Sequence, residues 1–133
     1  MSRRLRFSSA VLLALLSFAA YSAHAADPPR VIATAPQNGF REVDHSLKQI
    51  SVTFNQAMAD KSWSWSYENS KFPIPTGTPY FTDGGTTCVL PVQLEPGREY
   101  VIWINTAKFK NFKSVSGTPA QPYRLAFRTK RSQ

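Results

Sequence analysis

The chain has 133 residues, of which 16 are lysine or arginine and 8 are acidic, giving a formal net charge of +8. One cysteine excludes an intramolecular disulfide, and two histidines leave little from which to build a nucleophile–base pair or an imidazole metal site. We therefore expect a small module without catalytic activity or cofactor.

The first 25 residues predict a secretory signal peptide. Three arginines within the first six residues precede an apolar run, residues 11–20, which is too short to span a bilayer. Ala23-His24-Ala25 then forms a cleavage site of small residues. Cleavage there leaves residues 26–133, with 13 basic and 8 acidic residues and a net charge of +5. We expect an exported protein, periplasmic, secreted or at the cell surface.

The net charge and the expected export limit the classes of partner. A moderately basic surface favours anionic contacts, such as cell-envelope polymers, and export makes nucleic acid a poor partner. No second apolar run follows the signal peptide, so we expect no stable membrane insertion. We also expect a monomer.

The first half of the mature chain reads as short strands. Residues 30–35 predict a strand that ends at Pro36 and an Asn-Gly turn, and residues 40–43 resume pairing on the other sheet. Residues 49–55 alternate, which places Ile50, Val52 and Phe54 toward the core. Met58 is expected to plug the end of the sandwich.

Residues 62–67 alternate serine with aromatic residues. Trp63, Trp65 and Tyr67 therefore share one face of a strand. A buried tryptophan is typical of the third strand of an immunoglobulin-like sandwich, which favours a core position for them. The alternative is an exposed platform that stacks on sugar rings. Prolines and a glycine in residues 69–79 predict a stiff loop that crosses to the other sheet.

A hairpin follows. Residues 80–82 and 86–92 are separated by Asp-Gly-Gly, which predicts two antiparallel strands joined by a turn. Cys88 and Leu90 point inward in this register. Cys88 is then a buried thiol that acts as a small hydrophobic residue.

The most informative motif is Leu94-x-Pro96-Gly97-x-x-Tyr100, which precedes a strand at residues 101–104. Its spacing predicts a tyrosine corner, in which the tyrosine hydroxyl bonds to the backbone just upstream. Tyr100, Ile102 and Ile104 would point inward. Val101 and Trp103 would lie on the outer face, which makes Trp103 a second candidate for an exposed aromatic residue.

Residues 105–122 form a long irregular connection with lysines and phenylalanines interleaved. Loops at the ends of a sandwich often bind partners, so one interpretation is a contact loop. In the other interpretation the phenylalanines tuck under the sandwich while the lysines reach solvent. The candidate binding residues are Lys108, Phe109, Lys110, Phe112, Lys113 and Trp103. Residues 123–129 then predict a last strand with Tyr123, Leu125 and Phe127 inward.

About seven short strands with turn signals between them predict an all-β, immunoglobulin-like Greek-key sandwich of antiparallel strands, forming one domain over residues 26–133. The residues expected to be structural are Leu94, Pro96, Gly97, Tyr100, Trp65 and Phe54.

Taken in order, these residues resemble a family. The chain is similar to the bacterial Ig-like domain first named from S-layer proteins (the SbsA type). The similarity lies in Pro29-x-Val31, Pro36-x-x-Gly39, Ile50-x-Val52-x-Phe54-x-x-x-Met58, the Leu94-to-Tyr100 motif and Leu125-x-Phe127-x-Thr129. This resemblance implies a non-catalytic Ig-like module of secreted or surface proteins. Lys113 stands in the region before Gly117 where such domains often carry an aspartate, so no ion site is carried over.

A second resemblance is to periplasmic copper-binding Ig-like proteins, which begin near Ala-His-Ala and share the early strand pattern. In them a mature N-terminal histidine and a later Asp-x-His supply metal nitrogens. Here His24 would serve only after a different cleavage, the late loop has no histidine, and His45 alone cannot build a site. We expect no metal.

The sequence thus predicts an exported module that binds an unknown protein or an anionic cell-envelope polymer through its end loops. The alternative function is carbohydrate binding by exposed tryptophans.

Overall fold

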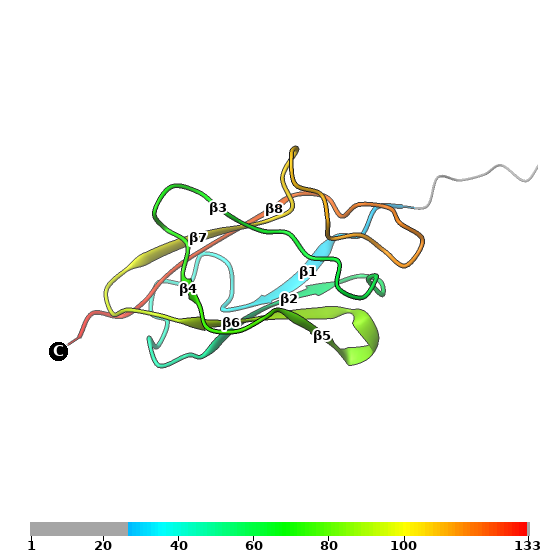
Figure 1. Cartoon of the computed structure of the whole chain (residues 1–133). Coiled ribbons are helices and arrows are strands. Elements are labelled where there is room, and N and C mark those ends of the chain that lie inside the picture. Colours follow the sequence, from blue (N-terminus) through cyan, green and yellow to red (C-terminus); the bar gives the residue numbers. More distant parts are fainter. Residues whose placement is uncertain (1–26, 133) are drawn as a thin grey trace, which may run out of the picture.

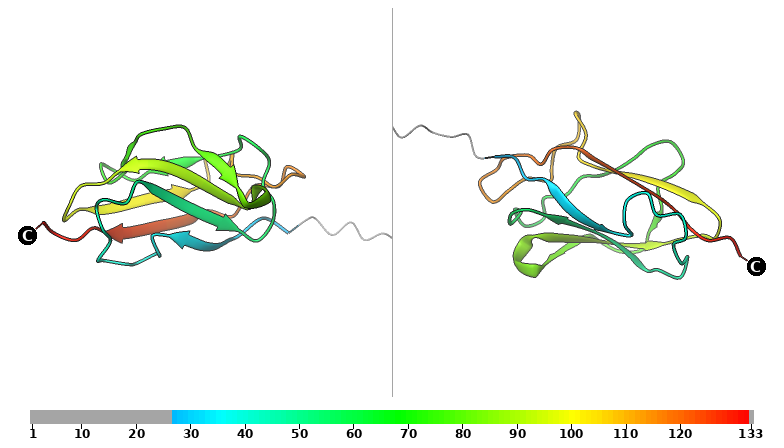
Figure 2. Two further views of the ribbon diagram at one scale, coloured as in Figure 1. Left: turned by 90° about the horizontal axis from the view of Figure 1, so that it is seen from below. Right: turned by 180° about the vertical axis from the view of Figure 1, so that it is seen from behind.

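A computed structural model describes residues 27–132, and its strands form two facing antiparallel sheets. Figure 1 shows the two layers, and the turned views in Figure 2 show β7 (yellow) and β8 (red) facing the blue-to-green strands. The signal peptide predicted at residues 1–25 lies outside the described residues. Within the described part, no helix has the length and apolar character needed to cross a bilayer.

The larger sheet has five strands. Its order is β1 (Val31–Ala35), β2 (Gln49–Phe54), β6 (Thr87–Gln93) and β4 (Ile74–Pro75), and β5 (Tyr80–Thr82) also pairs with β6. The predicted hairpin is confirmed, because β5 and β6 pair antiparallel around the short 3₁₀ helix η1 (Asp83–Gly85).

The smaller sheet has the order β3 (Trp65–Tyr67), β7 (Glu99–Ile104) and β8 (Tyr123–Arg128). Val43 joins it through a bridge to Thr129, which confirms that the chain after β1 resumes pairing on the other sheet. The crossing predicted for residues 69–79 is also confirmed, since the chain leaves β3 in one layer and reaches β4 at the edge of the other (Figure 1).

The core lies between the sheets and is built from alternate residues of the long strands. Ile50, Val52 and Phe54 of β2 are buried, as their alternation predicted, because successive side chains of a strand point to opposite faces. Cys88 and Leu90 of the neighbouring strand β6 lie beside Val52 and Ile50 on the same face of the sheet. The opposite sheet contributes Tyr100, Ile102, Ile104, Leu125 and Phe127, and Met58 is buried with them as predicted.

Phe112 of the long connection is the largest departure from a core made only of strands. Its side chain is fully buried, with ring centroids 5.3 Å from Phe54, 5.5 Å from Trp65 and 6.4 Å from Phe81. Phe112 thus fills the end of the sandwich from a loop. The expectation that it contributes to a binding surface is wrong, because a core side chain cannot reach a partner.

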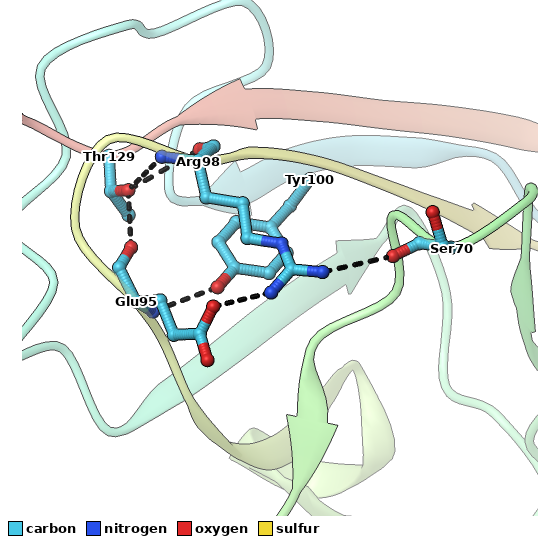
Figure 3. Close-up of polar contacts among 5 residues, drawn as sticks. All are labelled: Ser70, Glu95, Arg98, Tyr100 and Thr129. Atoms are coloured by element: carbon cyan, nitrogen blue, oxygen red, sulfur yellow. Dashed lines mark hydrogen bonds and ion pairs between the residues drawn. The ribbon is translucent and has the colours of Figure 1, made fainter.

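The tyrosine corner is present (Figure 3). The Tyr100 hydroxyl accepts a hydrogen bond from the Glu95 main-chain N–H at 2.8 Å, five residues upstream. Thr129, which is buried, ties the same turn to the end of β8: its hydroxyl donates to the Glu95 carbonyl at 2.6 Å and accepts from the Arg98 N–H at 2.9 Å. Gly97 has φ +64°, so the turn needs the residue that the motif supplies.

The outer face of β7 differs from the prediction. Val101 is fully buried rather than exposed, and the Lys71 carbonyl accepts its main-chain N–H at 3.0 Å. Trp103 is half-buried on the same face. The Trp103 indole N–H donates to Glu68 Oε2 at 2.8 Å, so its polar edge is already engaged.

Candidate functional site

An apolar groove of about 780 Å³ runs along the side of the sandwich, and we call it the edge groove. Its lining comes from four segments: residues 63–67 at β3; Phe72, Pro75, Gly77 and Pro79 around β4; Leu90 of β6; and Thr106, Lys108, Phe109 and Asn111 of the long connection. These segments bring the two candidate surfaces, the aromatic alternation and the basic-aromatic loop, to one place.

The aromatic residues of segment 63–67 divide between core and surface. Trp63 and Trp65 are half-buried and pack against the core, with Trp65 edge-on to Phe112 and Trp63 against Phe81. Tyr67, by contrast, exposes 75% of its surface at one end of the groove. The core interpretation therefore holds for the two tryptophans and fails for the tyrosine, which is the last residue of the short strand β3.

The other end of the groove is formed by Phe109 and Lys108. Phe109 is 52% exposed, and the Lys108 ammonium lies 5.5 Å from the centre of its ring, a cation–π contact. The Thr106 hydroxyl accepts the main-chain N–H groups of both residues, at 2.9 Å from Phe109 and 3.2 Å from Lys108, and so fixes the tight turn that presents them.

The turn is held from inside by Asn105. Asn105 is fully buried at φ +59°, a left-handed conformation that asparagine tolerates better than most residues. Its side chain accepts the Phe112 N–H and donates to the carbonyls of Phe112 and Ala120. Asn105 thereby closes the base of residues 106–111, and sequence reasoning missed it. The only available signal was an asparagine directly after a buried strand.

The remaining candidate binding residues lie apart from the groove. Lys110 and Lys113 are exposed on the same loop but do not line the groove. Trp103 lies on the outer face of the smaller sheet, paired in register with Ser66, whereas Trp65 points inward. The structure therefore brings together Lys108 and Phe109 but not Trp103.

The polar cluster around Trp103 is centred on Glu68. Glu68 also accepts hydrogen bonds from Arg124, at 3.0 Å and 3.4 Å. The hydrogen bond from Arg124 is the main cause that lowers the Glu68 pKa below its ordinary value, and the bond from Trp103 adds to it. The carboxylate thus stays ionised and fixes the indole.

Cys88 is buried in the core, as predicted. Desolvation raises the pKa of its thiol to about 12, so the reactive thiolate is scarce at neutral pH. The Trp65 indole N–H faces the thiol and slightly opposes this rise, although its geometry falls short of a hydrogen bond.

Metal ligands do not gather in the described part of the chain. No group of three or more histidine, cysteine or acidic side chains lies close enough to hold an ion among residues 27–132. His45 is exposed, and His24, the other imidazole considered for copper, lies outside the described residues.

Comparison with solved structures finds the same sandwich in the S-layer protein SbsC. The N-terminal part of SbsC matches with a TM-score of 0.50 and 15% identity, over 77% of this chain and 24% of that one. A structure of rSbsC(31–844) matches at 0.49 and 15% identity, over 80% of this chain and 14% of that one. The chain thus spans about a quarter or less of these proteins, and the likeness concerns the fold alone.

No curated protein matches the chain. The family model described as "Bacterial Ig-like domain" matches residues 25–129, which is most of the sequence and includes every strand of the sandwich. The chain therefore belongs to the bacterial Ig-like domain family.

Proposed function

We propose that this protein is an exported, non-catalytic module that binds a component of the cell envelope in the edge groove. One observation carries the proposal: the groove joins exposed aromatic surface to the Lys108 ammonium, and no carboxylate lines it. Exposed apolar surface of this kind on a small protein is typical of an interaction site. Export is supported by the leader pattern of residues 1–25.

A non-catalytic role is supported by the state of the most nucleophilic side chain. The Cys88 thiol is buried and its pKa is raised, so it is withheld from covalent chemistry. The family to which the chain belongs is an Ig-like domain family, which agrees with a binding rather than a catalytic module.

Carbohydrate binding by the tryptophans is the second candidate. It is favoured by the exposure of Tyr67 and Phe109 at the two ends of the groove, because open aromatic rings can stack on sugars. It is disfavoured for the tryptophans themselves, since Trp63 and Trp65 pack against the core and Trp103 lies on the outer face.

The test is co-sedimentation of the purified protein with isolated bacterial envelopes. Phe109→Ser combined with Lys108→Ala should reduce retention about tenfold, since both lining groups are lost. The matched control is Val115→Ser with Lys113→Ala, because these residues are exposed on the same loop but outside the groove. Equal loss in both double variants, or no retention of the wild type, would contradict the proposal.

A further inference from the structure

The edge groove lies beside strand β3, not on one of its faces. Ser64, Trp65, Ser66 and Tyr67 all line it, although successive residues of a strand point to opposite sides of a sheet. A groove that contacts residues from both faces of the strand must run along the edge of that strand. β3 is the edge strand of its sheet, so the groove occupies the position that a fourth strand would take.

The register of β3 and β7 leaves hydrogen-bonding groups facing this space. The Ser64 carbonyl accepts the Asn105 N–H at 3.2 Å, so Ser64 and, two residues on, Ser66 form the hydrogen-bonded pairs with β7. The N–H and C=O groups of Trp65 and Tyr67 therefore point away from β7. Among residues 27–132 these groups have no hydrogen-bond partner, and such an edge is a template for another strand.

The opposite wall has a different character. It is built by Pro75, Gly77 and Pro79, and the prolines have no N–H to offer. The prolines leave this wall few main-chain donors, so it provides mainly apolar surface. The groove thus has one wall that can hydrogen-bond a main chain and one that can pack against side chains, which is the combination that binds an extended peptide.

Four residues with side-chain hydroxyls line the groove, and those of Ser64 and Thr106 already accept hydrogen bonds. Ser64 Oγ accepts the Asn111 N–H at 3.0 Å, and the Thr106 hydroxyl accepts two N–H groups of its own turn. A sugar needs several free side-chain partners for its hydroxyls, whereas a peptide strand needs mainly the free main-chain groups. The free main-chain groups of Trp65 and Tyr67 therefore favour a polypeptide over a glycan.

The positive charge of Lys108 at one end of the groove indicates which chemical group the occupant carries there. Asn111 and Asn105 both bond to Ser64, so the turn that carries Lys108 lies at the Ser64 end of β3, away from Tyr67. Lys108 forms no ion pair within the described residues. An acidic side chain or a terminal carboxylate is the complementary group at that end.

We propose that the edge groove binds an extended segment of a partner protein, which adds to the free edge of β3 through Trp65 and Tyr67 and places an acidic group at Lys108. This inference rests on the proposed function of the groove and names its partner class. Alternate apolar side chains of the segment pack between Trp65, Leu90 and the proline wall.

The first experiment uses a phage-displayed library of random linear twelve-residue peptides, selected on protein purified after expression of the full chain. Enriched peptides should alternate apolar residues and carry an acidic residue at one end. N-methylation of the amides on one edge of such a peptide should abolish binding, while methylation on the other edge should not. Failure to enrich any sequence, or equal tolerance of methylation on both edges, would overturn the proposal.

Two pairs of variants locate the strand. Tyr67→Pro removes the N–H that faces the groove and leaves the ladder to β7 intact, so it should weaken peptide binding about tenfold more than Tyr67→Ala does. Lys108→Glu should weaken binding about tenfold, and the control Lys113→Glu should not. Equal effects within either pair would overturn the proposed placement.

Proteinase treatment of the envelopes separates this inference from the proposed function. Loss of retention after treatment supports a polypeptide partner. Groove-dependent retention that survives treatment would overturn the strand proposal, in favour of a polymer, while the proposed function would stand. A dimer that forms through β3 and excludes the selected peptides would likewise overturn it, because the occupant would be a second copy.

Discussion

The side chain of Asn105 hydrogen-bonds both main-chain polar groups of Phe112, accepting from the N–H at 2.9 Å and donating to the carbonyl at 2.8 Å. This relationship fixes the loop at two levels. It holds the Phe112 ring in the core, and it closes the turn on which Lys108 and Phe109 reach the edge groove. The stability of the fold and the shape of the candidate site therefore depend on the same buried amide.

Asn105→Asp should destabilise the protein strongly. The carboxylate keeps the acceptor for the Phe112 N–H but cannot donate to the carbonyls of Phe112 and Ala120. The buried Ala120 carbonyl would lose its partner, and the Phe112 carbonyl would keep only the Ala120 N–H. We expect a loss of about 2–5 kcal/mol in the free energy of unfolding, measured by urea denaturation. Asn111→Asp, on the exposed part of the same loop, is the control and should change stability by less than about 0.5 kcal/mol. Similar losses for both would contradict the role of Asn105.

Tyr100→Phe tests the tyrosine corner. It removes the acceptor of the Glu95 N–H while keeping the buried ring, so the unfolding free energy should fall by about 1–3 kcal/mol. Tyr80→Phe, on a half-exposed ring, serves as the matched control. A change within error for Tyr100→Phe would mean that the turn is held by Thr129 alone.

Much of this fold could be predicted because its signals are local. The alternation of Ile50, Val52 and Phe54 needs only the two-residue period of a strand, and the corner needs only the spacing from Leu94 to Tyr100. Burial of Val101 could not be predicted in this way. The parity of β7 places Val101 on the outer face, and its main-chain contact with Lys71, beyond the end of β3, leaves no periodic trace in either segment.

The candidate site was predictable only in pieces. The sequence marks Lys108 and Phe109 as unusual and Tyr67 as aromatic, but nothing in it shows that residues 63–67 and 106–111 line one groove. Phe112 and Phe109 both stand next to lysines in the sequence, but the Phe112 ring is buried and the Phe109 ring is exposed. Which ring is buried is decided by the hydrogen bonds of Asn105, a tertiary effect.

Cys88 should make stability depend on alkaline pH. Its thiol pKa rises from 9.0 to about 12 in the folded protein, so between these values the unfolded chain has lost the proton and the folded chain keeps it. This contribution to stability is complete below pH 9 and is lost as pH rises toward 12. Cys88→Ala should therefore lose less stability than the wild type between pH 8 and pH 10.5, whatever its stability at pH 7.

The same burial predicts the thiol's reactivity. An aromatic disulfide reagent at pH 8 should not label Cys88 in the native protein and should label it fully in denaturant. Fast labelling of the native protein would contradict the buried position.

The indole N–H signal of Trp103 should report on Glu68. Because Arg124 holds the Glu68 pKa below its ordinary value of 4.5, the carboxylate keeps its hydrogen bond to Trp103 until the pH falls below that value. An NMR titration should show the Trp103 signal shifting only in that acidic range. Glu68→Gln should move this signal and leave those of Trp63 and Trp65 in place. A Trp103 signal that shifts neither at acidic pH nor in Glu68→Gln would show that the hydrogen bond to Glu68 is absent.

The central claim is that β3 presents a free edge to the groove, and amide hydrogen exchange resolved by residue tests it most directly. The N–H of Ser66 bonds to β7 and should exchange slowly, whereas those of Trp65 and Tyr67 face the groove and should exchange much faster. Alternation of this kind along three consecutive residues supports a vacant strand position. Equal protection of all three would contradict it, because the edge would then already be paired.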